Sequence, residues 1–289
     1  MGQRIAIVTD STADFPKGVA ETLGIRFMPV HVVIDGVDYR DGVNMTARQL
    51  VDRMTQGAVV STRAAAPAEY ADLFESLLGR YDRVLSFQVS SQFSDSYESA
   101  GNALSLLSPE DATRVDIFDT GSVSIGQAIY TIMAARYLKT YGRIEGMKET
   151  LDAAMAESVN TITVDDLVWL RKSGALGSLP ALFGGLFDIK PIIALKNGRM
   201  TRVSRVRGMT RALDEMAVCA GQLKETDLGG WEVWVCHCDA EANAFYLRNK
   251  LAEVLGKEMD SIPVVAAGAS IAARFGPGSC SWGMIPLKR

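Results

Sequence analysis

Five serines lie within the fourteen residues FQVSSQFSDSYESA, from Phe87 to Ala100. A serine that acts as a nucleophile needs a neighbouring base to take its proton. This stretch contains no histidine, and the two histidines of the chain, His31 and His237, lie in patterns typical of strands. Hydroxyl groups without a base can still serve as neutral hydrogen-bond donors, which is a chemistry suited to holding an anion.

Ser94 is the serine whose position is most informative. It follows an apolar run typical of a strand, Arg83–Ser91, and opens a helical pattern, Ser94–Leu107. At that place its hydroxyl is expected to cap the helix. The same helix N-terminus would offer unpaired N–H groups and a positive potential to an anion. Both interpretations, a cap alone and a cap that also binds an anion, remain open from these residues.

Two further groups of residues are of types that can bind a metal ion. Asp10 and Asp14 of VTDSTAD are potential ligands, but turns and caps after a strand use the same residue types. In Cys236-His237-Cys238, a strand would place the two cysteines on one face and the histidine on the other. That spacing fits no usual zinc pattern, so we expect buried, reduced thiols. We expect no metal and no cofactor, and the common nucleotide-binding and hydrolase motifs are absent.

The composition describes an ordinary globular protein. The chain has 289 residues, 48% of them hydrophobic and 22% charged, with a net charge of −4. This balance argues against nucleic acid or an anionic membrane as the main partner. The first residues lack the features of a signal peptide, and the most apolar segment, Leu179–Leu195, is interrupted by Asp188, Lys190 and Pro191. We therefore expect a cytoplasmic monomer without a membrane segment.

The first half of the chain alternates strand and helix patterns. Strands are predicted at Arg4–Asp10, Arg83–Ser91 and Arg114–Thr120, and helices at Ala66–Tyr81, Ser94–Leu107 and Gly121–Gly142. This order predicts a largely parallel sheet flanked by helices. Asp35-Gly36 inside Val30–Asp41 adds the signal of a β-hairpin.

The second half predicts a different architecture. Asn197-Gly198 indicates a hairpin, and two strand patterns flank a helix at Asp239–Gly256. We expect an α/β protein of two domains, residues 1–159 with the mostly parallel sheet and residues 160–289 as an α+β domain with a mixed or antiparallel sheet. A ligand site between two closely packed domains is a common arrangement.

Segments along nearly the whole chain match the motifs of one protein family. VSSQFSDSYESA resembles the motif S-S-x-L-S-G-T-Y, and IAIVTDSTADFP resembles the opening I-x-I-V-T-D-S-T-A-D-L-P. TRAAAPAEY is similar to T-S-Q-P-S-P-x-E-F, and FGPGSCSWG to H-T-G-P-G-x-x-G. The hairpin segment FMPVHVVIDGVDYRDGVNMT, FDTGSVSIG and FGGLFDIKPIIALKNGRM match further segments, in the right order. With these motifs the chain resembles the DegV family of fatty-acid-binding proteins.

The resemblance implies a two-domain protein with one long-chain fatty acid bound between the domains. It implies that the hydroxyls of Thr62 and Ser94 bind the carboxylate. It also implies that a separate fatty-acid kinase receives the bound acid and makes an acyl phosphate, so this chain would be a carrier and not an enzyme. A carboxylate removed from water must be hydrogen-bonded, and that is what the hydroxyls would supply.

The chain departs from the family pattern at three places. Asp95 and Ser96 replace the glycine and threonine after the binding serine, and Ser96 is a further candidate for ligand binding. We expect Asp95 to turn outward and to form a capping pair with Glu98. Ala175 replaces a family arginine, which puts a docking role of that arginine in doubt. Arg274 replaces a family histidine near the head group, where it would either pair with the carboxylate or be a solvated residue at a helix end.

Two other classes of function stay open at this point. One is a serine-dependent lipid acyl hydrolase with Ser94 as nucleophile, which would need a base that the sequence does not offer. The other is an enzyme that binds phosphate or a nucleotide at the same helix N-terminus.

Overall fold

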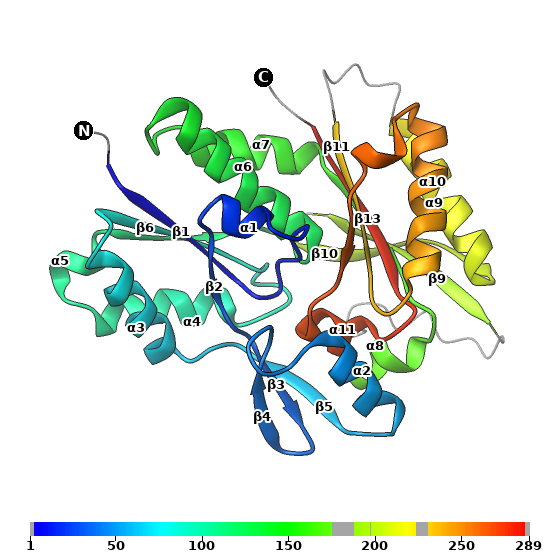
Figure 1. Ribbon diagram of the computed structural model, residues 1–289, viewed down its shortest axis with the longest axis horizontal. Helices are drawn as coiled ribbons and strands as arrows, with labels where there is room; N and C mark the ends of the chain where they lie inside the picture. The colour runs from blue at the N-terminus through cyan, green and yellow to red at the C-terminus, as the bar shows by residue number, and fades with distance from the viewer. Residues whose placement is uncertain (1–2, 175–187, 197, 224–230, 287–289) are drawn as a thin grey trace.

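A parallel sheet forms the centre of the first half of the chain (Figure 1). The computed structural model describes residues 3–174, 188–196, 198–223 and 231–286. The four strands lie in the order β2–β1–β6–β7: β1 (Ile5–Asp10), β2 (Arg26–Met28), β6 (Arg83–Gln88) and β7 (Val115–Asp119). All three neighbouring pairs are parallel, which confirms the predicted sheet.

Helices cover both faces of this sheet because its strands are apolar on both sides. The helices of this half are α1 (Val19–Thr22), α2 (Ala47–Thr55), α3 (Pro67–Leu78), α4 (Ser96–Ala103), α5 (Pro109–Ala112), α6 (Ile125–Tyr141) and α7 (Met147–Glu157), with a 3₁₀ turn at Leu104–Leu106. Ala6 and Val8 of β1 belong to the cluster formed with α3 and α4, whereas Ile7 belongs to the cluster formed with α6 and α7. This alternation is the period of two that a strand imposes.

A small antiparallel sheet lies beside the parallel one. Its order is β4–β3–β5, with β3 (His31–Ile34), β4 (Val37–Arg40) and β5 (Val60–Arg63). The predicted hairpin is confirmed: Asp35 and Gly36 join β3 to β4 with φ angles of 50° and 83°, as a tight two-residue hairpin turn requires. β5 pairs with the other edge of β3 and places Thr62 opposite Val32.

The second half of the chain builds a six-stranded mixed sheet, as predicted. Its order is β10–β9–β8–β13–β11–β12. The strands are β8 (Val159–Thr163), β9 (Ile189–Lys196), β10 (Arg199–Arg207), β11 (Trp231–His237), β12 (Val264–Ala266) and β13 (Cys280–Pro286). Only β11 and β12 pair in parallel among these described strands. Asn197 of the predicted hairpin lies outside the described residues, but β9 and β10 on either side of it are antiparallel, with Lys196 opposite Arg199.

Four helices accompany this sheet in the described part of the chain: α8 (Leu167–Lys172), α9 (Met209–Leu223), α10 (Glu241–Leu255) and α11 (Ala269–Phe275), with a 3₁₀ turn at Met259–Ser261. α9 and α10 pack on one face, and α6 of the first half packs against β13 and β11 from the other side (Figure 1). α11 shares a hydrophobic cluster with residues of this sheet and also contacts β3, β5, α2 and α8. Through α11, a segment near the end of the chain therefore reaches the small sheet near its beginning.

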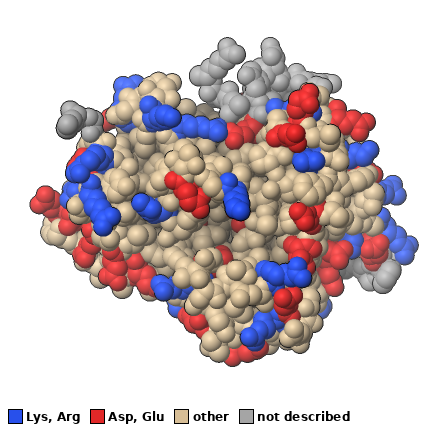
Figure 2. Space-filling model, viewed as in Figure 1, with Lys and Arg blue, Asp and Glu red and all other residues tan. Residues whose placement is uncertain are grey.

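The surface carries both signs of charge. In Figure 2, acidic and basic side chains are interspersed over the visible face, without a large patch of one sign. Among the described residues, no helix is both long enough and apolar enough to cross a membrane.

Candidate functional site

Three of the four predicted ligand residues line one cavity. Its volume is about 300 Å³. Thr62 comes from β5, Ser94 from the turn before α4, and Arg274 from the last turn of α11. Valine and isoleucine side chains form part of the remaining wall: Val30, Val89, Val123 and Ile271. The cavity thus combines a small set of polar groups with an apolar lining, which is the usual character of a small-molecule site.

Ser96, the fourth predicted residue, lies behind the cavity wall. Its side chain is fully buried, and its Oγ lies 3.0 Å from the Oγ of Ser94. The backbone N–H of Ser96 also donates to Ser94 Oγ over 3.2 Å. Ser96 is therefore placed to orient Ser94 and does not itself line the cavity.

The expected capping arrangement at α4 is wrong in detail. α4 begins at Ser96, so its N-cap is Asp95 and not Ser94. The chain first makes a turn in which the N–H groups of Phe93 and Ser94 point to the carbonyl of Ser90, and this delays the start of the helix. Asp95 makes no side-chain capping hydrogen bond, so the predicted pair with Glu98 does not form. Asp95 is exposed, in agreement with its expected outward orientation.

Arg274 is half-buried and is not a solvated residue at a helix end. Its Nη1 donates to the carbonyl of Phe93 over 2.7 Å, next to Ser94. Burial lowers the pKa of its guanidinium from the ordinary value, and no acidic side chain pairs with it among the described residues. The remaining N–H donors of Arg274 are therefore available to an anion in the cavity.

The backbone next to Arg274 is held in place. Gly276 has a φ of 75°, and a Cβ atom at this position would lie 2.3 Å from the ring of Trp169. Ser173 donates its hydroxyl to the Arg274 carbonyl over 3.0 Å. The predicted tight turn at Gly276–Gly278 thus fixes the end of α11 and with it the position of the guanidinium.

Two buried carboxylates, whose positioning role sequence reasoning missed, hold the start of α11. Asp41 accepts from the backbone N–H groups of Ala269, at 2.9 Å, and Ser270, at 3.1 Å. Asp14 accepts from the N–H of Gly268 at 2.7 Å and from the hydroxyl of Ser124 at 2.6 Å. Burial raises the pKa of Asp14 to about 7 and also raises the pKa of Asp41.

The metal interpretation of Asp10 and Asp14 is replaced by one of backbone capping. Asp10 accepts from the N–H groups of Thr12, at 2.9 Å, and Val89, at 2.8 Å. Asp14 connects the N-terminal loops to α11, as described above. The only sequence signal for these roles was a polar cluster directly after a buried strand. Such a cluster shows that a turn needs caps, but it does not show which distant helix receives one.

The Cys236-His237-Cys238 segment is packed as a strand and its end. Cys236 and Cys238 are buried, and burial raises the pKa of both thiols. The Nδ1 atom of His237 accepts from the N–H of Ala240 over 3.2 Å. These contacts give each member of the segment a structural role. Ala175, where the family pattern has an arginine, lies outside the described residues.

Comparisons with known proteins agree with this fold. A family profile described as "Uncharacterised protein, DegV family" matches residues 4–287. A DegV domain-containing protein of Deinococcus radiodurans is 32% identical over 284 residues, covering 98% of this chain and 99% of the relative.

Solved structures show the same similarity over the whole chain. A fatty-acid-binding DegV family protein of Thermus thermophilus has a TM-score of 0.89 and 28% identity, covering 98% of this chain and all of that one. A stearic-acid-binding protein of Eubacterium ventriosum also has a TM-score of 0.89, with 26% identity and 98% of both chains covered. From its profile, its relatives and its fold together, the chain belongs to the DegV family.

Proposed function

We propose that this protein binds a long-chain fatty acid and holds its carboxylate between Thr62, Ser94 and Arg274. The observation that carries the proposal is the half-buried guanidinium of Arg274, which faces the cavity without an acidic partner among the described residues. Two hydroxyl side chains line the same cavity, so three neutral or cationic donors converge on one small volume. A carboxylate is the natural complement of such a donor set.

Hydrogen bonding within the serine pair supports this arrangement. When Ser94 donates its proton to a carboxylate, its oxygen is free to accept one from Ser96, 3.0 Å away. A donor that itself accepts a hydrogen bond is polarised and binds an anion more strongly. Ser96 therefore acts through Ser94, as a positioning residue.

The ligand class follows from the relatives and from the apolar wall. The structures from Thermus thermophilus and Eubacterium ventriosum are described as fatty-acid-binding and stearic-acid-binding. Burial of each methylene group contributes about 0.8 kcal/mol, so a long acyl chain would remain bound through purification.

We further propose that the bound carboxylate is presented to a separate fatty-acid kinase. Thr62 and Arg274 also line a second, smaller depression of about 130 Å³, whose wall includes the exposed residues Ser61 and Lys172. A carboxylate held by Thr62 and Arg274 would therefore lie close to a face that a partner can approach. In this role the protein is a carrier, acting as a cytoplasmic monomer with domains 1–159 and 160–289.

The hydrolase alternative gains no support from the site. The hydroxyl of Ser94 has serine groups as its hydrogen-bond partners. The ring of His31 is held between Asp38, at 2.7 Å, and Glu69, at 3.0 Å. A fluorophosphonate probe provides a direct test, since labelling of Ser94 would favour a hydrolase over a carrier.

Mass spectrometry of ligand extracted from the purified protein tests the main proposal. We expect a free fatty acid in close to one-to-one ratio with the protein, and uptake of added stearic acid by delipidated protein. Protein that yields no fatty acid and also fails to take one up would refute the proposal. Inorganic phosphate that competes with stearic acid would show that the donor set binds anions generally. Acyl phosphate formation by an added fatty-acid kinase, dependent on this protein, tests the presentation step.

A further inference from the structure

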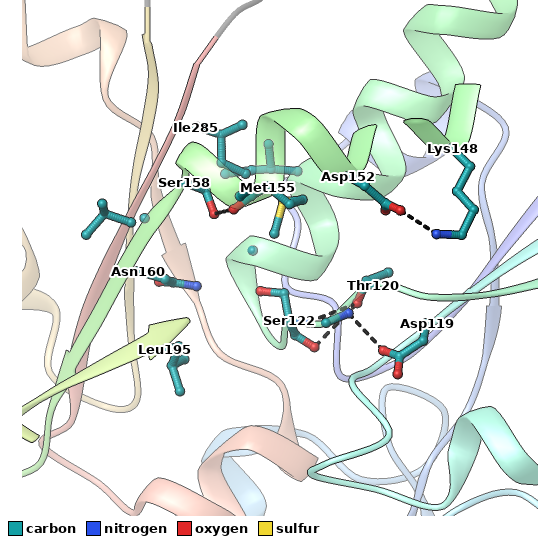
Figure 3. Close-up of a pocket in the computed structure, with 16 residues that line it drawn as sticks. Asp119, Thr120, Ser122, Lys148, Asp152, Met155, Ser158, Asn160, Leu195 and Ile285 are labelled. Carbon is teal, nitrogen blue, oxygen red and sulfur yellow. Dashed lines mark hydrogen bonds and ion pairs between the residues drawn. The ribbon is translucent and has the colours of Figure 1, made fainter. Parts of the chain in front are cut away.

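A second, larger cavity lies where the first half of the chain meets the six-stranded sheet (Figure 3). Its volume is about 350 Å³. α6 and α7 form one side, and β8, β9 and β13 form the other. The described wall mixes apolar side chains such as Ile129, Met155 and Ile285 with polar ones such as Ser122 and Asn160.

A small space lies between this cavity and the carboxylate cavity and shares wall residues with both. Val123 and Ile271 line both the carboxylate cavity and a small, largely apolar space of about 20 Å³. Asn160 and Leu195 line both that small space and the second large cavity. An acyl chain that leaves the carboxylate cavity past Val123 and Ile271 would therefore arrive at Asn160.

Asn160 is the unusual residue on this route. It is only 6% exposed, and its Oδ1 atom has no hydrogen-bond partner among the described residues. Leaving a buried acceptor unpaired costs roughly 1–3 kcal/mol, so such a group in a cavity wall points to a missing partner. Figure 3 shows the side chain pointing from β8 toward the start of α6.

The surroundings leave room for the amide of Asn160. Gly283 is its neighbour on β13, and a Cβ atom there would lie 3.2 Å from Oδ1. At Gly126 of α6, a Cβ atom would lie 2.7 Å from the Asn160 Nδ2 and 2.1 Å from the Ser122 Oγ. The amide nitrogen and the Ser122 hydroxyl therefore both lie beside Gly126, and a side chain at either glycine would crowd the amide.

We propose that Asn160, together with Ser122, binds a hydroxyl group on the distal part of the acyl chain, so that the preferred ligand is a hydroxylated fatty acid. The proposal rests on the proposed function and deepens it. A hydroxyl both donates and accepts, so it can pair with Ser122 and with either end of the amide. Nδ2 lies on the side of Ser122, and a half-turn of the amide brings Oδ1 to that side instead. In a purely apolar route, burial of a hydroxyl without a partner would weaken binding.

The role of Asn160 is tested by measuring how plain and hydroxylated fatty acids bind to three proteins. Stearic acid and a set of hydroxystearic acids, with the hydroxyl at successive positions, are titrated into the delipidated wild-type protein, Asn160→Leu and Thr161→Val. Thr161 is the matched control because it is the next residue of β8, is 2% exposed, and has a hydroxyl that is equally unpaired within the described chain. As the alternate residue of the strand it faces the opposite side of the sheet.

For the wild type we expect at least one hydroxystearic acid to bind more tightly than stearic acid. In Asn160→Leu that isomer should bind roughly tenfold more weakly than stearic acid, because its hydroxyl loses its partner. Thr161→Val should behave as the wild type. The wild-type measurement stands even if Asn160→Leu does not fold.

Two results would overturn the inference. If no hydroxystearic acid binds the wild type more tightly than stearic acid, Asn160 does not select a hydroxylated chain. If the wild type and Asn160→Leu show the same ratio of affinities, the amide has no part in ligand choice. Tight binding of stearic acid in either case would leave the proposed function intact, whereas failure of all the acids to bind would refute both.

Discussion

Replacing Arg274 is the sharpest test of the carboxylate site. The guanidinium already gives one N–H to the carbonyl of Phe93, and its other donors face a cavity without an acidic partner among the described residues. A hydrogen bond to a charged group contributes about 1.5–3 kcal/mol. Arg274→Ala should therefore weaken fatty-acid binding by roughly one to two powers of ten.

Arg63 offers a matched control for this change. It lines the same cavity, but its guanidinium is already paired with Asp38 and lies 3.0 Å from the ring of His31. A positive charge that is already neutralised contributes less to a second anion, so Arg63→Gln should change the affinity less than Arg274→Ala. Isothermal titration of stearic acid into delipidated protein measures both, with circular dichroism to verify folding.

The dependence on pH adds a second measurement. Arg274 stays charged at every accessible pH, whereas a histidine loses its charge as the pH rises through about 6.5. Affinity in Arg274→His should therefore fall between about pH 6 and 8 relative to the wild type. Asp14, whose pKa is about 7, titrates in the same range, but it is present in both proteins and cancels in their ratio.

Two outcomes would refute the reasoning. If Arg274→Ala binds stearic acid as tightly as the wild type, the arginine does not contact the head group. If Arg63→Gln loses as much affinity as Arg274→Ala, the effect is one of general positive charge and not of a specific contact. In the first case the carboxylate would be held by Thr62, Ser94 and backbone groups alone.

Three further predictions concern the rest of the site and its support. Ser94→Ala and Thr62→Val should each weaken stearic acid binding by roughly one to two powers of ten in the same titration, and unchanged affinity in both would place the head group elsewhere. Burial raises the folded-state pKa of Asp14 to about 7, above its unfolded value of 3.8, so the folded protein holds this proton more tightly than the unfolded chain does. The free energy of unfolding should therefore fall as the pH rises from about 4 to 7. Asp14→Asn should remove part of that decline, as measured by urea unfolding. Gly276→Ala should destabilise the protein by at least about 2 kcal/mol, because a clash with Trp169 adds to the strain of a positive φ. Gly142→Ala should cost only about 1 kcal/mol, because Gly142 has a φ of 63° but no close neighbour in the described chain. Equal losses of stability in the two variants would contradict the clash.

Much of the fold could be read from local sequence patterns. The apolar runs that became β1, β6 and β7 and the Asp35-Gly36 turn formed as predicted, because period and turn chemistry are properties of neighbouring residues. The start of α4 was misplaced by two residues, since a turn anchored on Ser90 competes with the helix at its first residues.

The candidate site was predictable only in part. Thr62 and Ser94 were found through motif resemblance, and the structure places both on one cavity with Arg274. The sequence left two interpretations of Arg274 open, a carboxylate partner and a solvated residue. The structure excludes the solvated one, because α11 packs against β3 and β5 and half-buries the guanidinium.

By itself, the sequence indicated β1, β6, β7, both hairpins and the helices α3, α4, α6 and α10, and it placed the Ser94 hydroxyl beside a helix start. It did not indicate β5, α2 or α9. Tertiary structure alone decided that Asp14 and Asp41 cap α11, and that Asn160 has a buried oxygen without a described partner. The physical reason is the range of the interactions. Periodicity and turn propensity act over a few residues, whereas burial, pKa and hydrogen-bond satisfaction depend on groups more than two hundred residues apart, such as Asp41 and Ala269.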